Sequence, residues 1–241
     1  MFVGVTRPGE RRGIVREVIE LRRGRAGGRG RAHLLPPPPG RADAMPMAMP
    51  RTAPVVEPAD GYFTVEMVDA LNELTPKGEW YECVYGELFH VTPPRLWHAV
   101  VVERLCSALR AYAEHEPAAG WVSGQQAKIT FQRRDTNVSP DVWAVRREEM
   151  RALDWNGLTG LLLAAEVLSP STKRRDRFTK RRLYQNQGVP LVWIVDADAH
   201  LVEVWTPDAD LPHVERERLV WAPEGAREPF ALALAELFAP L

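Results

Sequence analysis

Two acidic residues of the chain stand in apolar surroundings, where a carboxylate is costly. Asp141 follows Pro140 and opens the apolar run Asp141–Val145. Glu166 lies near the end of a second apolar run, Leu161–Leu168. Burying a carboxylate without a positive or hydrogen-bonding partner is strongly unfavourable. Two acids at the ends of neighbouring strands can instead share a divalent cation, and Mg²⁺ typically takes one or two protein carboxylates. The pair therefore predicts a metal site; the alternative is a structural ion pair between Glu166 and an arginine of the next helix.

The segment after Glu166 concentrates positive charge. A polar turn, Ser169–Thr172, leads into KRRDRFTKRR, which has seven basic residues and one acid. Asp176, Lys180 and Tyr184 follow at four-residue spacing and so share one face of a helix. We expect Lys180 to reach back toward the carboxylates, although a solvated basic face is the simpler alternative. The side chains that we expect to contact phosphates are Arg174, Arg175, Arg181 and Arg182.

The formal net charge of −1 over 241 residues hides an asymmetry. Residues 1–55 contain eleven arginines and four acids, which gives +7, so the remainder carries −8. This segment is also rich in proline and glycine, which predicts a disordered basic arm before a single globular domain over residues 56–241. Two interpretations stay open: an extension read upstream of a true start at one of the methionines 45, 47 or 49, or an arm that contacts nucleic-acid phosphates.

Other features of the composition exclude several classes of protein. Cys83 and Cys106 form neither a ligand cluster nor a disulfide framework, which favours a reducing, cytoplasmic location. No apolar run approaches the roughly 20 residues of a membrane span, so we expect no membrane contact.

The pattern of apolar residues predicts an α/β (α+β) domain. The simplest packing is a mixed central sheet with one helix before and one after its central strands. The predicted helices cover residues 65–74, 95–116, 175–187 and 232–238. The predicted strands cover residues 80–84, 87–91, 127–131, 141–145, 161–168, 191–196, 201–206 and 218–221.

Four blocks of the sequence occur in an order that is similar to a known family. They are YECVYGELFHVTPPRLWHAVV, SPDVWAV, AAEVLSPST and KRRLYQNQGVPLVWIVDADAHLVEVW. In this order they resemble the Uma-two type of bacterial restriction endonucleases, which belong to the PD-(D/E)xK nuclease superfamily. The resemblance covers Tyr62 to Thr206 and implies a restriction endonuclease-like mixed central β-sheet flanked by helices.

The resemblance also implies a set of site residues. The metal-binding acid of the superfamily falls on Asp141, and its second acid falls on Glu166. The superfamily has a lysine two residues after the second acid, and this position is Leu168 here. In this family type a lysine of the next helix replaces it, and Lys180 matches that place. Glu87, in the GEL block, matches an acid that such families add to the metal site.

Two further positions bear on the resemblance. Tyr85 stands where the family usually has an acid, which affects the fine tuning of the site and leaves its core acids in place. His98 matches a frequent family position, yet a single histidine in a helix is more often a packing or capping residue.

Together these features predict a metal-dependent DNA endonuclease. Mg²⁺, or Mn²⁺ in its place, would be held by Asp141, Glu166 and Glu87, and Lys180 would orient water or neutralise developing charge. We expect DNA as the partner, no small-molecule cofactor, and a homodimer, since many nucleases that cut both strands are symmetric. The displaced lysine keeps an alternative open, a catalytically inactive nuclease fold that serves as a DNA-binding or protein-interaction module. A protein-binding domain that never contacts DNA is a further alternative, which a wide separation of the acids and Lys180 would support.

Overall fold

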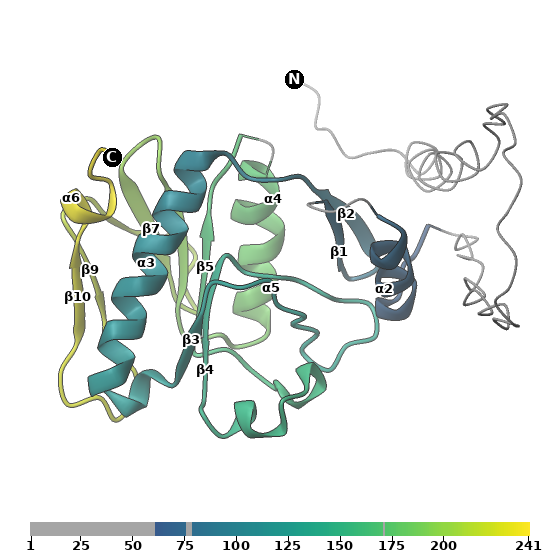
Figure 1. Ribbon diagram of the computed structural model, residues 1–241, viewed down its shortest axis with the longest axis horizontal. Coiled ribbons are helices and arrows are strands. Elements are labelled where there is room, and N and C mark those ends of the chain that lie inside the picture. Colours follow the sequence, from purple (N-terminus) through teal and green to yellow (C-terminus); the bar gives the residue numbers. More distant parts are fainter. Residues whose placement is uncertain (1–60, 76–78, 171) are drawn as a thin grey trace, which may run out of the picture.

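The structure is a computed structural model that describes residues 61–75, 79–170 and 172–241. The basic arm predicted for residues 1–55 lies outside the described residues, as does the beginning of the predicted domain 56–241. The described chain forms a central sheet, with a small lobe at one end and a C-terminal hairpin at the other (Figure 1).

A mixed sheet of six strands forms the centre, as predicted. Its order is β3-β4-β5-β6-β7-β8, and β5 and β6 are parallel while each other neighbouring pair is antiparallel. All side chains of β4, β5 and β6 are buried, which matches strands covered on both faces. The strands are β3 (Trp121–Ser123), β4 (Val142–Val145), β5 (Leu163–Val167), β6 (Val192–Asp196), β7 (Leu201–Trp205) and β8 (His213–Glu215).

Different elements cover the two faces of this sheet. The long helix α3 (Leu96–His115) lies on one face and the α4–α5 segment on the other (Figure 1). The side chains of β6 alternate accordingly: Trp193 packs into the core beneath α3, and Ile194 packs into the core beneath α5. The first core also includes residues of β9 (Arg218–Trp221), β10 (Phe230–Ala233) and α6 (Leu234–Leu237).

The small lobe consists of α2 (Val65–Leu74) and the hairpin of β1 (Trp80–Val84) and β2 (Glu87–Val91). Thr64 caps α2 by accepting a hydrogen bond from the Met67 amide. The hairpin turns at Tyr85 and Gly86, both with positive φ, and a Cβ on Gly86 would lie 2.3 Å from the Tyr62 ring. The lobe has its own apolar core and brings β1 toward the sheet.

The basic segment does not form the single regular helix that we predicted for residues 175–187. It begins earlier, with α4 (Lys173–Arg175), continues through a π-helical turn (Asp176–Lys180), and ends with α5 (Arg181–Asn186). Gly188, with φ of +70°, follows the last turn as expected for a C-terminal breaker. Single π-helical turns inside helices are frequent at functional sites.

Two other predictions of secondary structure need correction. Residues 127–131 form no strand and make one isolated bridge, Ile129 with Val138, because this stretch belongs to a long connection between β3 and β4. The predicted helix over 232–238 shortens to four residues, since its first part pairs with β9 as strand β10. Within the described residues, no helix is both long and apolar enough to cross a bilayer.

Candidate active site

The structure brings the two predicted acids together at one end of the sheet. Val142 of β4 pairs with Ala165 of β5 in antiparallel register, so Asp141 and Glu166 form the next opposite pair. Asp141 Oδ2 accepts a hydrogen bond from the Val167 amide at 2.7 Å, which fixes this carboxylate. The side chain of Asp141 is 26% exposed, whereas that of Glu166 is only 3% exposed.

Lys180 reaches this pair from the π-helical turn. Its Nζ lies 2.7 Å from Glu166 Oε1 and donates to the Ser139 carbonyl at 3.1 Å. Burial lowers the pKa of Lys180, but the charges of Glu166 and Glu82 outweigh it and hold this pKa above its ordinary value. The site therefore contains a buried ammonium ion.

A second acid beside Lys180 is Glu82, not the predicted Glu87. Glu82 Oε1 accepts hydrogen bonds from the Ser139 amide at 2.9 Å and from Lys180 Nζ at 3.3 Å. Glu87 lies nearer the turn of the same hairpin, opposite Val84, and it is Glu82 that lines the cavity with Lys180. Glu82 thus links the small lobe to the sheet.

Four further side chains complete the cluster. Tyr184 donates to Glu166 Oε1 at 2.5 Å, and Arg175 Nε lies 3.2 Å from Asp176 Oδ1, which is also buried. His98, on α3, has its Nε2 3.4 Å from Asp141 Oδ1. Burial lowers the pKa of His98, but the hydrogen bond and charge of Asp141 raise it above its ordinary value.

The cluster carries more negative than positive charge. With every carboxylate ionised and His98 neutral, its four carboxylates face two fixed cations, a formal surplus of two negative charges. Burial raises the pKa of Glu166, and the charges of Asp176, Asp141 and Glu82 raise it further. Lys180 opposes these effects, but the pKa of Glu166 still lies well above its ordinary value. The carboxylates that carry this surplus belong to Glu82, Asp141, Glu166 and Asp176.

The donor atoms fit a hard divalent cation such as Mg²⁺. Asp141 and Glu166 offer carboxylate oxygens from opposite strand positions, and Glu82 Oε2 is buried without a hydrogen bond. Among the described residues, no three His, Cys, Asp or Glu side chains converge as a ready-made ligand set. Mg²⁺ usually keeps several waters and takes one or two protein carboxylates, so a two-carboxylate site agrees with both observations.

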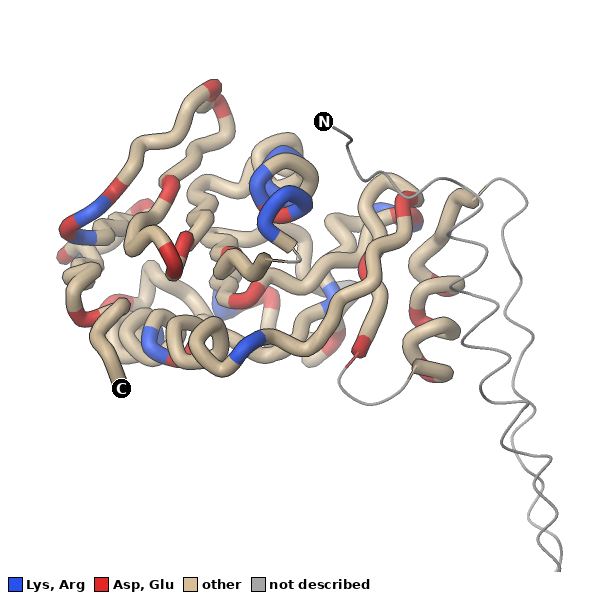
Figure 2. Tube along the Cα trace, turned by 90° about the horizontal axis from the view of Figure 1, so that it is seen from above, with Lys and Arg blue, Asp and Glu red and all other residues tan. Residues whose placement is uncertain are grey.

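The four predicted phosphate-binding arginines separate into two kinds. Arg174 and Arg182 are exposed. They belong to the α4–α5 segment, along which lysines and arginines gather (Figure 2). Arg175 turns into the cavity, and Arg181 lies 4.1 Å from the centre of the Trp205 ring, where it is buried. The apolar packing of Trp205 thus withdraws Arg181 from the surface that the sequence predicts for it.

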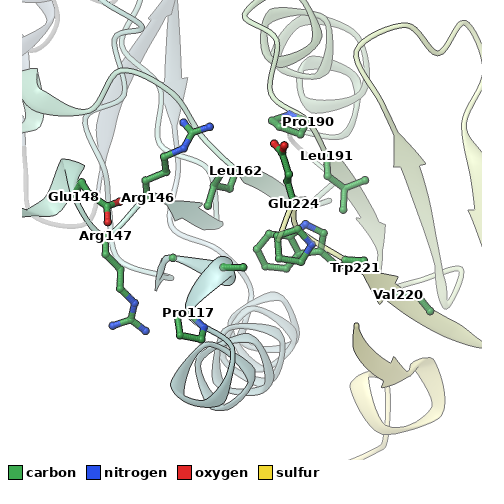
Figure 3. Close-up of a pocket in the computed structure, with 14 residues that line it drawn as sticks. Pro117, Arg146, Arg147, Glu148, Leu162, Pro190, Leu191, Val220, Trp221 and Glu224 are labelled. Atoms are coloured by element: carbon green, nitrogen blue, oxygen red, sulfur yellow. The ribbon is translucent and has the colours of Figure 1, made fainter. Parts of the chain in front are cut away.

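A larger cavity lies elsewhere, at the opposite end of β4 and β5. It has a volume of about 570 Å³, and its charged residues are Arg146, Arg147, Glu148 and Glu224 (Figure 3). All four are exposed and their charges balance, and the side chains of Arg146 and Arg147 point away from each other. The carboxylate cavity has only about 50 Å³, enough for an ion and water, yet it contains the buried charges.

Comparison with known proteins identifies the family and the fold. Residues 66–235 match the family model described as "Uma2: Putative restriction endonuclease". The chain belongs to the Uma2 family. No curated protein matches the Uma2 chain, but a solved structure does: a "putative nuclease belonging to DUF820" from Anabaena variabilis ATCC 29413. The TM-score is 0.59 at 19% identity, over 73% of this chain and 98% of that chain, which shows a shared fold. The predicted family and the predicted mixed, helix-flanked sheet are confirmed, and the family supports nuclease activity in general.

Proposed function

We propose that this Uma2 protein hydrolyses DNA phosphodiester bonds with Mg²⁺, or Mn²⁺ in its place, held by Asp141 and Glu166. The observation that carries the proposal is the surplus of negative charge around a buried lysine at the end of β4 and β5. Structural ion clusters are normally balanced, because an unpaired buried charge is costly. A divalent cation would compensate this surplus, and membership of a restriction endonuclease family supports the choice of substrate.

Each residue of the cluster has a definite part in this proposal. A bound metal ion would lower the pKa of a water molecule and polarise the scissile phosphate. The Val167 amide and Tyr184 fix the orientations of Asp141 and Glu166. Lys180, held by Glu82, orients the attacking water or neutralises charge on the phosphate oxygens. The exposed cations Arg174 and Arg182 bind the DNA backbone, which makes binding salt-dependent.

A metal-titrated cleavage assay tests the proposal. The parent, Asp141→Asn and Glu166→Gln are incubated with plasmid and single-stranded DNA in Mg²⁺, Mn²⁺ or a chelator. We expect cleavage by the parent with metal only, and rates about 10³-fold lower in both variants. Asp196→Asn, which removes a carboxylate from the same end of the sheet, is the matched control and should cleave like the parent. Cleavage by either site variant at the rate of the parent would contradict the assignment of Asp141 and Glu166 as metal ligands.

A catalytically silent nuclease fold is the second candidate, and Leu168 at the usual lysine position favours it. Binding of DNA without cleavage in either metal would support this reading. The third alternative, a protein-binding domain that never contacts DNA, would have been supported by a wide separation of the acids and Lys180, and Lys180 Nζ lies 2.7 Å from Glu166. A homodimer stays a prediction, which light scattering of the purified protein tests.

A further inference from the structure

A second cavity adjoins the carboxylate cavity on the solvent side of Asp141. This side cavity has a volume of about 210 Å³. It shares five lining residues with the carboxylate cavity, and these are Trp80, Pro94, His98, Ser139 and Asp141. Asp141 is the most exposed of the catalytic carboxylates, so a substrate that reaches it must also border the side cavity.

The lining of the side cavity combines apolar groups with uncharged amides. Trp80, Ala99 and Val102 supply apolar surface, while the exposed Gln125 and Gln126 supply amide donors and acceptors. Tryptophan rings stack with nucleobases of any sequence, and glutamine pairs with the amino edge of adenine. The lining is therefore suited to a planar, polar-edged ring.

Charge decides against a phosphate as the occupant of the side cavity. The acidic residues that line it are Asp141 and Glu103, and no lysine or arginine belongs to the described lining. Since Asp141 is taken up by the metal ion in the proposed function, Glu103 is the remaining acid of the lining. Its carboxylate repels a phosphate but can accept a hydrogen bond from an exocyclic amino group, as Glu does from cytosine. A neutral base that carries an amino group satisfies both conditions.

Unpaired polar atoms mark the same place. Buried polar groups normally have hydrogen-bond partners, so each exception requires a reason. Trp80 Nε1 and His98 Nδ1 are buried without a hydrogen bond, and both residues line both cavities. Among the described side chains the other atoms buried without a hydrogen bond are Trp193 Nε1 and Glu82 Oε2, the latter in an ion pair with Lys180 Nζ at 3.3 Å. Three of the four therefore belong to residues that line the joined cavities.

We propose that the side cavity binds an unpaired nucleobase with an exocyclic amino group, adenine or cytosine, beside the phosphodiester that is cut. This inference rests on the proposed function and names its substrate class. A base inside a duplex is stacked and paired and cannot enter a protein cavity unless it is extruded. The preferred substrate is therefore single-stranded, looped or bulged DNA.

Cleavage of matched substrates tests the inference. One sequence is offered as a single strand, as a perfect duplex, and as a single strand with an abasic nucleotide at each position around the cut. We expect kcat/KM to fall about tenfold for the duplex and for one abasic position next to the cut, and little at the others. Equal cleavage of the duplex and the single strand, with no effect of any abasic position, overturns the inference while the nuclease function stands.

A double-mutant cycle locates the base in the cavity. Gln126→Ala should lower kcat/KM about tenfold on the intact strand and leave it unchanged on the abasic strand, where the partner is already missing. Gln132→Ala, at an exposed glutamine of the same β3–β4 connection outside both cavities, is the control and should match the parent. An equal loss in Gln126→Ala on both strands contradicts the assignment.

Failure of the proposed function gives a separate result. If the parent cleaves no DNA in Mg²⁺ or Mn²⁺, the same cycle is measured as binding affinity by fluorescence anisotropy. Base-dependent binding that Gln126→Ala abolishes supports the cavity in a catalytically silent protein. Equal affinity for the intact and the abasic strand overturns the inference.

Discussion

Two buried carboxylates lie at the same end of neighbouring parallel strands, Glu166 on β5 and Asp196 on β6. Both pair with cations of the same basic segment. Asp196 Oδ2 lies 2.9 Å from Lys173 Nζ and 2.9 Å from Arg177 Nη2, while Glu166 pairs with Lys180. Burial and ion pairing alone therefore do not distinguish them.

Charge balance does distinguish them. Around Asp196, the two acids Asp196 and Glu203 face the two cations Lys173 and Arg177. Burial raises the pKa of Asp196, but hydrogen bonds from Lys173, the Ala199 amide and Arg177 bring it below its ordinary value. The pKa of Glu166 is raised, first by burial and then by the charges of Asp176, Asp141 and Glu82, which add to burial while Lys180 opposes it. The balanced cluster stabilises the fold, and the unbalanced one is where we place the chemistry.

Removal of the lysine from each cluster should separate them most strongly. Without metal, Lys180→Met should lower the free energy of unfolding by about 3–5 kcal/mol, because Glu82 and Glu166 lose their buried partner. Lys173→Met should cost less than about 1 kcal/mol, since Lys173 is 44% exposed and Arg177 still pairs with Asp196. Urea unfolding measures both, and equal losses would refute the contrast between the clusters.

Mg²⁺ should stabilise the protein only through the unbalanced cluster. At tenfold its dissociation constant, a ligand of the native state adds about 1.4 kcal/mol to the free energy of unfolding. We expect this gain in the parent and in Asp196→Asn, and its loss in Asp141→Asn. Thermal unfolding with and without Mg²⁺ provides the measurement. A gain that survives in Asp141→Asn would place the ion elsewhere.

The features predicted correctly from sequence are those that a short stretch of chain determines. The apolar neighbours of Asp141 and Glu166 predict buried strand ends, and the four-residue spacing after Asp176 predicts that Lys180 shares its face. The turn at Tyr85 and Gly86 likewise follows from local backbone preference. These predictions require no knowledge of how distant segments pack.

Contacts between distant segments could not be predicted from the sequence. Glu82 reaches Lys180 only because the small lobe packs against the sheet. A signal did exist, since its same-face neighbours Trp80 and Val84 are apolar. His98 meets Asp141 from α3, and Arg181 meets Trp205 across 24 residues, with no sequence signal for either contact.

The outward and inward arginines of the basic segment should also behave differently. Arg182→Ala should weaken DNA binding and reduce the slope of log affinity against log salt by about 0.7–0.9, because one phosphate contact is lost. Arg181→Ala should leave that slope unchanged and lower the free energy of unfolding by about 1 kcal/mol, through lost packing on Trp205. Salt titrations of DNA binding together with urea unfolding test the pair. A reduced slope of log affinity against log salt in Arg181→Ala would show that Arg181 contacts DNA phosphates.

Acid should weaken the balanced cluster in a defined range of pH. The pKa of Asp196 is lower in the folded protein than its ordinary value of 3.8, so the unfolded chain takes up the proton first as pH falls. Its contribution, about 1 kcal/mol after allowance for its partly exposed partners, is therefore complete above about pH 4 and is lost as the pH falls through the folded-state pKa.

Asp196→Asn isolates this contribution from other carboxyls with lowered pKa values, such as Asp135 and Glu116. The parent should exceed the variant in free energy of unfolding at pH 6, and the difference should shrink toward zero near pH 2. Urea unfolding at a series of pH values gives the two curves. A difference in free energy of unfolding that stays constant across the range would mean that the variant acts through packing. The charge of Asp196 would then not be stabilised by Lys173 and Arg177.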